Sequence, residues 1–168
     1  MNKLLLFFAI CFLTACSTTT VEVNKEAGYL NAGDAQYTAS LGDNETSAIW
    51  AKYLDAHNNR DMETIMSMES DSIKIWTPDG RFIEGKEAHS AVLTDWFAAA
   101  SPKWEEYFSL PAKVNWENQP GQWVLSGSVV TETIEGEEVQ QNHLIDAYIE
   151  DGLIQSFWVY SRVLVPAK

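Results

Sequence analysis

Asp146 is the side chain with the clearest potential for chemistry in this sequence. In an extended strand it shares a face with Leu144 and Tyr148, while Ile145 and Ala147 lie on the opposite face. A carboxylate enclosed by apolar walls has a raised pKa, because burial disfavours its charged form, and such a group suits proton transfer near neutral pH. Asp146 would therefore be a candidate general acid or base if its strand face is enclosed. The alternative is a buried carboxylate whose hydrogen bonds hold the fold together or orient a ligand.

The three histidines show no spacing that indicates a metal site. His57, His89 and His143 are far apart in sequence, and no His-x-x-x-His pattern occurs. His57 falls near the end of a predicted helix, where a cation would stabilise the helix dipole. His143 alternates to the strand face opposite Asp146. Since a Gly-rich phosphate loop, a Ser nucleophile elbow and a dinucleotide fingerprint are also missing, we expect no metal and no cofactor.

The N-terminus indicates export. Residues 1–15 carry one cation, an apolar run from Leu4 to Leu13 and a small-residue exit, which is typical of a signal peptide. The run is too short to span a bilayer. Leu13-Thr14-Ala15-Cys16 resembles the lipobox of bacterial lipoproteins, which implies cleavage before Cys16 and its acylation, with palmitate among the expected chains. An ordinary signal peptide with an incidental cysteine is the alternative.

Lipidation at Cys16 would anchor the mature chain in the membrane of the cell envelope. The next residue is Ser17 and not Asp, which favours the outer membrane, facing the periplasm or the surface, in a cell that has one. Cys11 leaves with the signal. No free thiol then remains for disulfides, nucleophilic catalysis or zinc ligation.

Acidic residues outnumber basic ones. Loss of Lys3 with the signal leaves 10 basic residues against 24 acidic ones, a net charge of about −14. Nucleic-acid affinity comes largely from Lys and Arg on phosphates, so we expect no nucleic-acid partner. The acidity is read as a source of solubility and not as an acidic binding patch.

The spacing of apolar residues changes from a helical to a strand period about halfway along the chain, which predicts helices first and strands second. Residues 16–44 lack periodicity and are predicted to form a lipid-anchored flexible tether, and residues 45–168 a single domain. Helical spacing predicts helices over 45–59, after Asp61, and over 86–100. A short hairpin is predicted between the last two, from 72–76 and 82–84.

Strands follow from residue 112 to the C-terminus. Alternation predicts strands over 112–117, 122–134, 139–150 and 153–164, and Glu135-Gly136 and Asp151-Gly152 are hairpin turn signals. Helices followed by an antiparallel meander predict an α+β fold, with the helices on one face of the sheet.

Three local patterns in this order resemble the SnoaL-like branch of the nuclear transport factor 2-like superfamily. They are the passage Tyr53–Asp61, the stretch Trp76–Gly80 with Ile83–Lys86, and the segment Asp146–Trp158. The resemblance covers residues 45–162. It implies a cone-shaped, curved antiparallel sheet packed on N-terminal helices, the cystatin-like roll, with an internal pocket. One such cone hosts many activities, so the fold does not specify the function.

The resemblance also places Asp146 inside the cone, where family members that transfer protons carry their acid. Trp158 and Tyr160 would share this inward face, and the helices would complete an aromatic wall suited to a flat or apolar ligand. The sequence departs from the family in having Tyr148 where Arg is frequent. The expected ligand-pocket residues are Trp50, Tyr53, Trp96, Tyr148, Trp158 and Tyr160.

Three functions remain open at this point. The first is an envelope lipoprotein whose cone binds a small, largely apolar organic molecule. The second is an isomerase, cyclase or dehydratase that uses Asp146 as general acid/base, and the third is a structural or partner-binding module. The opposite strand face is unusually apolar, which predicts a homodimer through the sheet, as is common in the family. Its residues are Ile145, Ala147, Ile149, Phe157 and Val159.

Overall fold

The structure is a computed structural model that describes residues 26–164. The predicted signal peptide and Cys16 lie outside these residues. Within the described part of the chain, no helix is long and apolar enough to cross a membrane.

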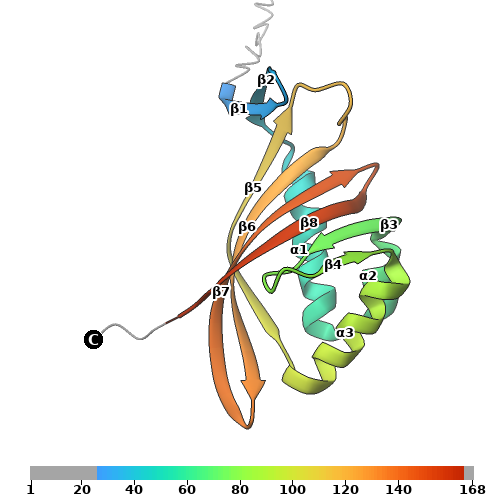
Figure 1. Cartoon of the computed structure of the whole chain (residues 1–168), viewed down its shortest axis with the longest axis vertical. Helices are drawn as coiled ribbons and strands as arrows, with labels where there is room; N and C mark the ends of the chain where they lie inside the picture. Colours follow the sequence, from blue (N-terminus) through green and yellow to red (C-terminus); the bar gives the residue numbers. More distant parts are fainter. Residues whose placement is uncertain (1–25, 165–168) are drawn as a thin grey trace, which may run out of the picture.

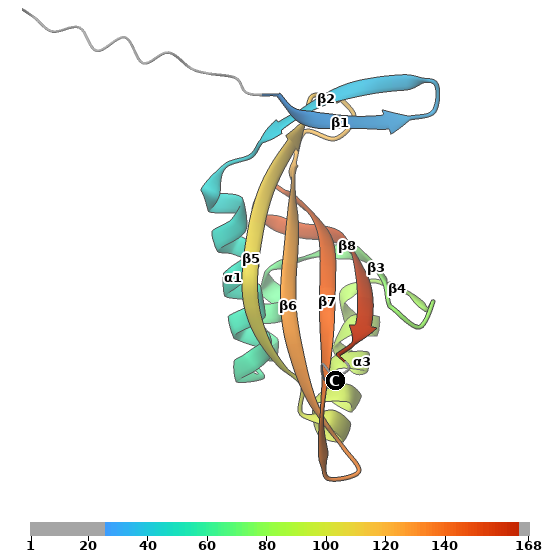
Figure 2. The same ribbon diagram turned by 90° about the vertical axis from the view of Figure 1, so that its left-hand side faces the viewer.

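One curved sheet of eight strands forms the body of the molecule, and the helices lie on one side of it (Figures 1 and 2). The strand order is β1-β2-β5-β6-β7-β8-β3-β4, with every neighbouring pair antiparallel except β3 and β8, which are parallel. The predicted α+β class and the curved sheet are confirmed. The strands are β1 (Glu26–Ala32), β2 (Ala35–Leu41), β3 (Glu69–Trp76), β4 (Phe82–Glu84), β5 (Lys103–Val114), β6 (Gln122–Ile134), β7 (Glu137–Glu150) and β8 (Leu153–Val163).

The helices begin and end close to the predicted positions. They are α1 (Asn44–Asn59), α2 (Met62–Ser67) and α3 (Lys86–Ala100). Asp61 caps α2, and its carboxylate accepts the backbone N–H of Thr64 at 3.0 Å. Tight turns also form where the sequence indicates them. Both residues of Glu135-Gly136 and of Asp151-Gly152 have positive φ, as a two-residue hairpin turn of the primed type requires.

Residues 26–41 differ from the predicted tether. They form the β1–β2 hairpin, and β2 pairs with β5 through Ala39 and Val114. The ring of Tyr37 stacks on Trp116, with centroids 5.1 Å apart. The hairpin is half-exposed and carries no apolar run, so its order depends on backbone pairing with the edge of β5, a long-range contact that local periodicity does not show. The tether prediction is wrong for these residues.

The core lies between the helices and the inner face of the sheet, the face that the helices cover. Ile145, Ala147, Ile149 and Phe157 point into it and are 4, 0, 4 and 6% exposed. These residues were expected on the outer face. The apolar side chains of these strands are buried against the helices of the same chain, so they need no partner subunit to cover them. The assignment of inner and outer faces from sequence was therefore wrong by one residue.

Candidate functional site

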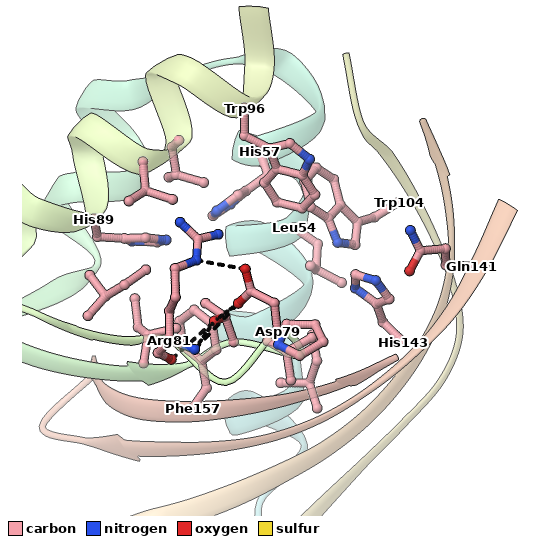
Figure 3. A pocket seen from close by; sticks show the side chains of 18 of the residues that line it. Leu54, His57, Asp79, Arg81, His89, Trp96, Trp104, Gln141, His143 and Phe157 are labelled. Atoms are coloured by element: carbon pink, nitrogen blue, oxygen red, sulfur yellow. Dashed lines mark hydrogen bonds and ion pairs between the residues drawn. The ribbon is translucent and has the colours of Figure 1, made fainter. Parts of the chain in front are cut away.

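A cavity of about 580 Å³ lies between the helices and the inner face of the sheet (Figure 3). Helices α1 and α3 form one wall, the inner face of β7 and β8 forms the other, and the β3–β4 turn borders it. Most of the lining is apolar or aromatic, including Trp50, Tyr53, Leu54, Trp96, Trp104, Ile145, Phe157 and Val159.

The expected pocket residues separate into two groups. Trp50, Tyr53 and Trp96 line the cavity. Asp146, Trp158 and Tyr160 instead lie on the outer face, in an open groove beneath the β1–β2 hairpin. Tyr148 is on the outer face too, where its ring lies 5.2 Å from that of Trp123 and its hydroxyl donates to Glu150 at 2.6 Å.

Asp146 is therefore not enclosed by the cone. Its cross-strand neighbours are Leu125 on β6 and Trp158 on β8. Partial burial among them raises the pKa of its carboxyl above the ordinary value of 3.8. The pKa of Asp146 is raised, as expected, but its carboxyl lies on the opposite side of the sheet from the cavity.

All three histidines line the one cavity, although they are far apart in sequence. His57 comes from α1, His89 from α3 and His143 from β7. No group of three or more His, Asp, Glu or Cys side chains within residues 26–164 is arranged to hold a metal ion. Their chemistry is therefore that of individual imidazoles in a largely apolar space.

His57 is a neutral hydrogen-bonding group. Its Nδ1 lies 2.8 Å from the backbone carbonyl of Tyr53, and since a carbonyl only accepts, Nδ1 carries the proton and Nε2 is left as an acceptor. Burial lowers the pKa of His57 to about 3, the hydrogen bond to Tyr53 opposes this shift, and His89 and Arg60 act electrostatically in the same direction as burial. The expected role as a cation at the helix end is wrong because the ring is buried among Tyr53, Phe97 and Trp104.

His89 is held by a buried carboxylate. Glu69, the first residue of β3, is 0% exposed, and its Oε1 lies 2.7 Å from Nδ1 of His89. The hydroxyl of Tyr53 donates to the same oxygen. Burial raises the pKa of the Tyr53 phenol well above 10, and the charge of Glu69 raises it further, so the phenol keeps its proton. Three elements, α1, β3 and α3, thus meet at one carboxylate.

Polar groups also gather at the other parts of the cavity lining. Glu132 accepts from Nε1 of Trp96 at 2.6 Å and from the Gln141 amide at 2.7 Å. Arg81 and Asp79 form an ion pair of 2.7 Å on the β3–β4 turn, with both side chains more than half exposed. In Figure 3 the Arg81 side chain extends toward the rings of His57 and His89. An exposed ion pair therefore borders the site.

Sequence reasoning missed the group formed by Glu69, His57 and His89. Both histidines continue the apolar stripes of their helices: His57 lies four residues after Tyr53, and His89 lies four before Leu93. A histidine on a buried helix face was the available signal. Glu69 had none, because the strand predicted from the sequence begins at residue 72, three residues after it.

Comparisons with known proteins bear on the fold. No family model and no curated protein matches the chain. Among solved structures, an LEH-like epoxide hydrolase of M. tuberculosis is similar with a TM-score of 0.59 and 16% identity, covering 71% of this chain and 84% of that one. A protein from Kribbella flavida assigned as a ketosteroid isomerase gives a TM-score of 0.57 and 15% identity, covering 76% and 85%.

A protein from Xanthomonas campestris assigned as a polyketide cyclase is also similar, with a TM-score of 0.60 and 14% identity, covering 70% of this chain and 90% of that one. At these identities the likeness shows the fold. The described domain therefore has the nuclear transport factor 2-like fold that the resemblance stated from sequence implies.

Proposed function

We propose that this chain, which has the nuclear transport factor 2-like fold, binds a small, largely apolar organic molecule in the cavity between its helices and its sheet. The observation that carries the proposal is the cavity itself, about 580 Å³ in volume with mainly apolar and aromatic walls. Its size lies in the range typical of sites for small organic ligands, which combine apolar walls with a few placed polar groups.

The polar groups indicate the kind of ligand. His57 presents an acceptor and His89 a second imidazole nitrogen, while the ion pair of Arg81 and Asp79 lies at the β3–β4 turn. A flat apolar molecule with one hydroxyl or other hydrogen-bond donor satisfies this arrangement. The solved structures of similar fold include proteins assigned as isomerases, cyclases and epoxide hydrolases, which is consistent with a small organic ligand.

The two other functions considered from the sequence are less well supported by the cavity. An enzyme that uses Asp146 is not supported, because Asp146 lies outside the cavity. A purely structural module does not account for a cavity of this size beside three histidines. We also propose that the protein is an envelope lipoprotein anchored through Cys16, and that it forms a homodimer through the outer face of the sheet.

Two neighbouring residues of β8 provide a test of ligand binding. Val159 lines the cavity, and Tyr160 lies on the outer face. We expect Val159→Trp to fill part of the cavity and to weaken binding of 2-naphthol, a flat phenol, at least 10-fold, because the added ring occupies the ligand's space. Tyr160→Trp should leave the affinity unchanged. Isothermal titration calorimetry gives the affinities.

Thermal melts of both variants provide the control for folding. Equal affinity of the wild type and the folded Val159→Trp variant would place the ligand elsewhere. No binding of 2-naphthol by the wild type at millimolar concentration would argue against the proposed function.

A further inference from the structure

We propose that His89, held by Glu69, is a general base and acid that exchanges a proton with molecules bound in the cavity. The substrates would be flat, largely apolar molecules with an acidic C–H or O–H group. This inference rests on the proposed function, because a substrate must first occupy the cavity. It assigns a proton-transfer role to a pair of residues that neither the sequence patterns nor the comparisons indicate.

The hydrogen bonds of Glu69 determine which nitrogen of His89 faces the cavity. Oε1 of Glu69 accepts the Tyr53 hydroxyl, which keeps its proton, so this oxygen is an acceptor for both of its partners. Nδ1 of His89, at 2.7 Å, is then the donor. Nε2 of the neutral ring is left with its lone pair, and His89 is among the residues that line the cavity. The pair has the arrangement in which a carboxylate orients an imidazole base and stabilises the imidazolium that forms.

Glu69 is difficult to explain as a purely structural residue. It is fully buried, and its Oε2 has no hydrogen-bond partner within residues 26–164. A buried charge that is only partly satisfied usually stabilises a fold less than a well-packed apolar residue of similar size. A buried polar atom without a partner is rare in folded proteins, and a role in chemistry is one explanation for it.

His57 provides the complementary contact. Its ring centroid lies 6.3 Å from that of His89, and both rings point into the cavity in Figure 3. The Nδ1 proton of His57 is committed to the Tyr53 carbonyl, and its pKa of about 3 makes Nε2 a weak base. His57 therefore accepts a hydrogen bond and orients the molecule, whereas His89 takes the proton.

A general reaction tests the base without knowledge of the natural substrate. In 5-nitrobenzisoxazole, Nε2 of His89 would take the hydrogen on C3 as a proton. The electron pair of that C–H bond forms the third bond of a nitrile, the N–O bond breaks, and its pair stays on oxygen as a coloured phenolate. The proton later leaves the imidazolium for water, so no oxidant, reductant or metal is required.

The experiment measures kcat and KM for this probe on the purified full chain and its variants. We expect His89→Gln to lower kcat about 10²-fold, since proton transfer by a positioned side chain typically contributes 10²–10⁴-fold. Glu69→Gln, which removes a positioning charge and keeps the side-chain shape, should lower kcat at least 10-fold and change KM less than twofold. Asp146→Asn is the matched carboxylate-to-amide control on the outer face, and its kcat should equal that of the wild type.

The outcomes separate this inference from the proposed function. If 2-naphthol binds the wild type but the probe is not turned over, or if folded His89→Gln retains the full kcat, the base assignment is overturned and the binding site stands. Loss of kcat in Asp146→Asn would also overturn it. If 2-naphthol does not bind, the proposed function fails. Should Glu69→Gln not fold, His89→Gln and His89→Asn, checked by thermal melts, decide the matter.

Discussion

His57 and His89 lie on the same wall of the cavity, and they differ in the group that each ring nitrogen meets. His57 donates to an uncharged carbonyl of its own helix, while His89 faces the carboxylate of Glu69. The two imidazoles therefore have different hydrogen-bond partners although they are the same residue type and line the same cavity. The state of His57 can therefore be tested through the stability of the protein, without a ligand or an activity.

The stability of the protein should depend on pH through His57. The ring stays neutral in the folded state down to a pKa of about 3, whereas in the unfolded chain it takes up a proton below its ordinary value of 6.5. Between these values the unfolded state binds more protons than the folded state. The free energy of unfolding therefore decreases as the pH is lowered, by up to about 1.4 kcal/mol per pH unit. We expect His57→Gln to flatten this dependence between pH 6.5 and 4, as measured by urea unfolding.

The comparison uses the slope and not the absolute stability, because the substitution also changes packing. The carboxyls of Asp61, Asp71 and Asp79 have lowered pKa values and contribute their own loss of stability in acid, but they do so in both proteins. Identical slopes for the wild type and His57→Gln would show that the ring is charged in the folded state.

At the scale of the elements, β7 and β8 carry apolar residues on both faces. The inner face packs on the helices, and the outer face exposes Leu144 and Tyr160, which are 44 and 54% exposed. On the neighbouring strands Leu110 and Leu125 pair across the sheet and are 45 and 38% exposed. Exposed apolar side chains that lie side by side on a sheet are typical of an interface, which supports the proposed homodimer.

A charge on this outer face should disrupt the homodimer. We expect the unlipidated chain to be dimeric at micromolar concentration and Leu144→Glu to be monomeric, because the interface would bury an unpaired carboxylate. Sedimentation velocity measures the change. Thr94→Glu, on the exposed face of α3, is the control and should remain dimeric. A monomeric wild type would contradict the proposal. Phe157→Glu is unsuitable, since Phe157 is 6% exposed in the core.

At the scale of the whole molecule, the position of the domain relative to a membrane depends on Cys16. Nine residues lie between Cys16 and Glu26, the first residue of β1, and the ten residue steps that join the two span at most about 35 Å when fully extended. The proposed anchor would hold the domain close to the envelope membrane.

Cys16→Ser tests the anchor. We expect the variant to lose its acyl chains and to move from the membrane fraction to the soluble fraction, because the chains supply the membrane affinity. Mass spectrometry of the mature N-terminus and fractionation of cells measure the two effects. Ser17→Ala, which keeps the cysteine, should remain in the membrane fraction. A Cys16→Ser protein that stays with the membrane would contradict the lipoprotein assignment.

The local features of the fold could be predicted from the sequence. Helical spacing located α1 and α3, Asp61 indicated the start of α2, and Glu135-Gly136 and Asp151-Gly152 indicated the hairpins. Each depends on contacts within a few residues, such as caps, turns and the repeat of one face. Three patterns in their order were enough to indicate the fold and the α+β class.

Tertiary packing decided the features that depend on distant residues. Alternation along β7 places Asp146 and Ile145 on opposite faces of the sheet, but it does not show which face the helices cover. The candidate acid was therefore assigned to the wrong face. The pairing of β2 with β5 likewise could not be predicted, because the hairpin sequence carries no apolar run that would indicate it. Glu69, His57 and His89 come from three elements. Tyr53 and His89 meet at the carboxylate of Glu69, and His57 bonds to the backbone carbonyl of Tyr53. This arrangement follows from how α1 and α3 pack against β3, and no local spacing in the sequence indicates it.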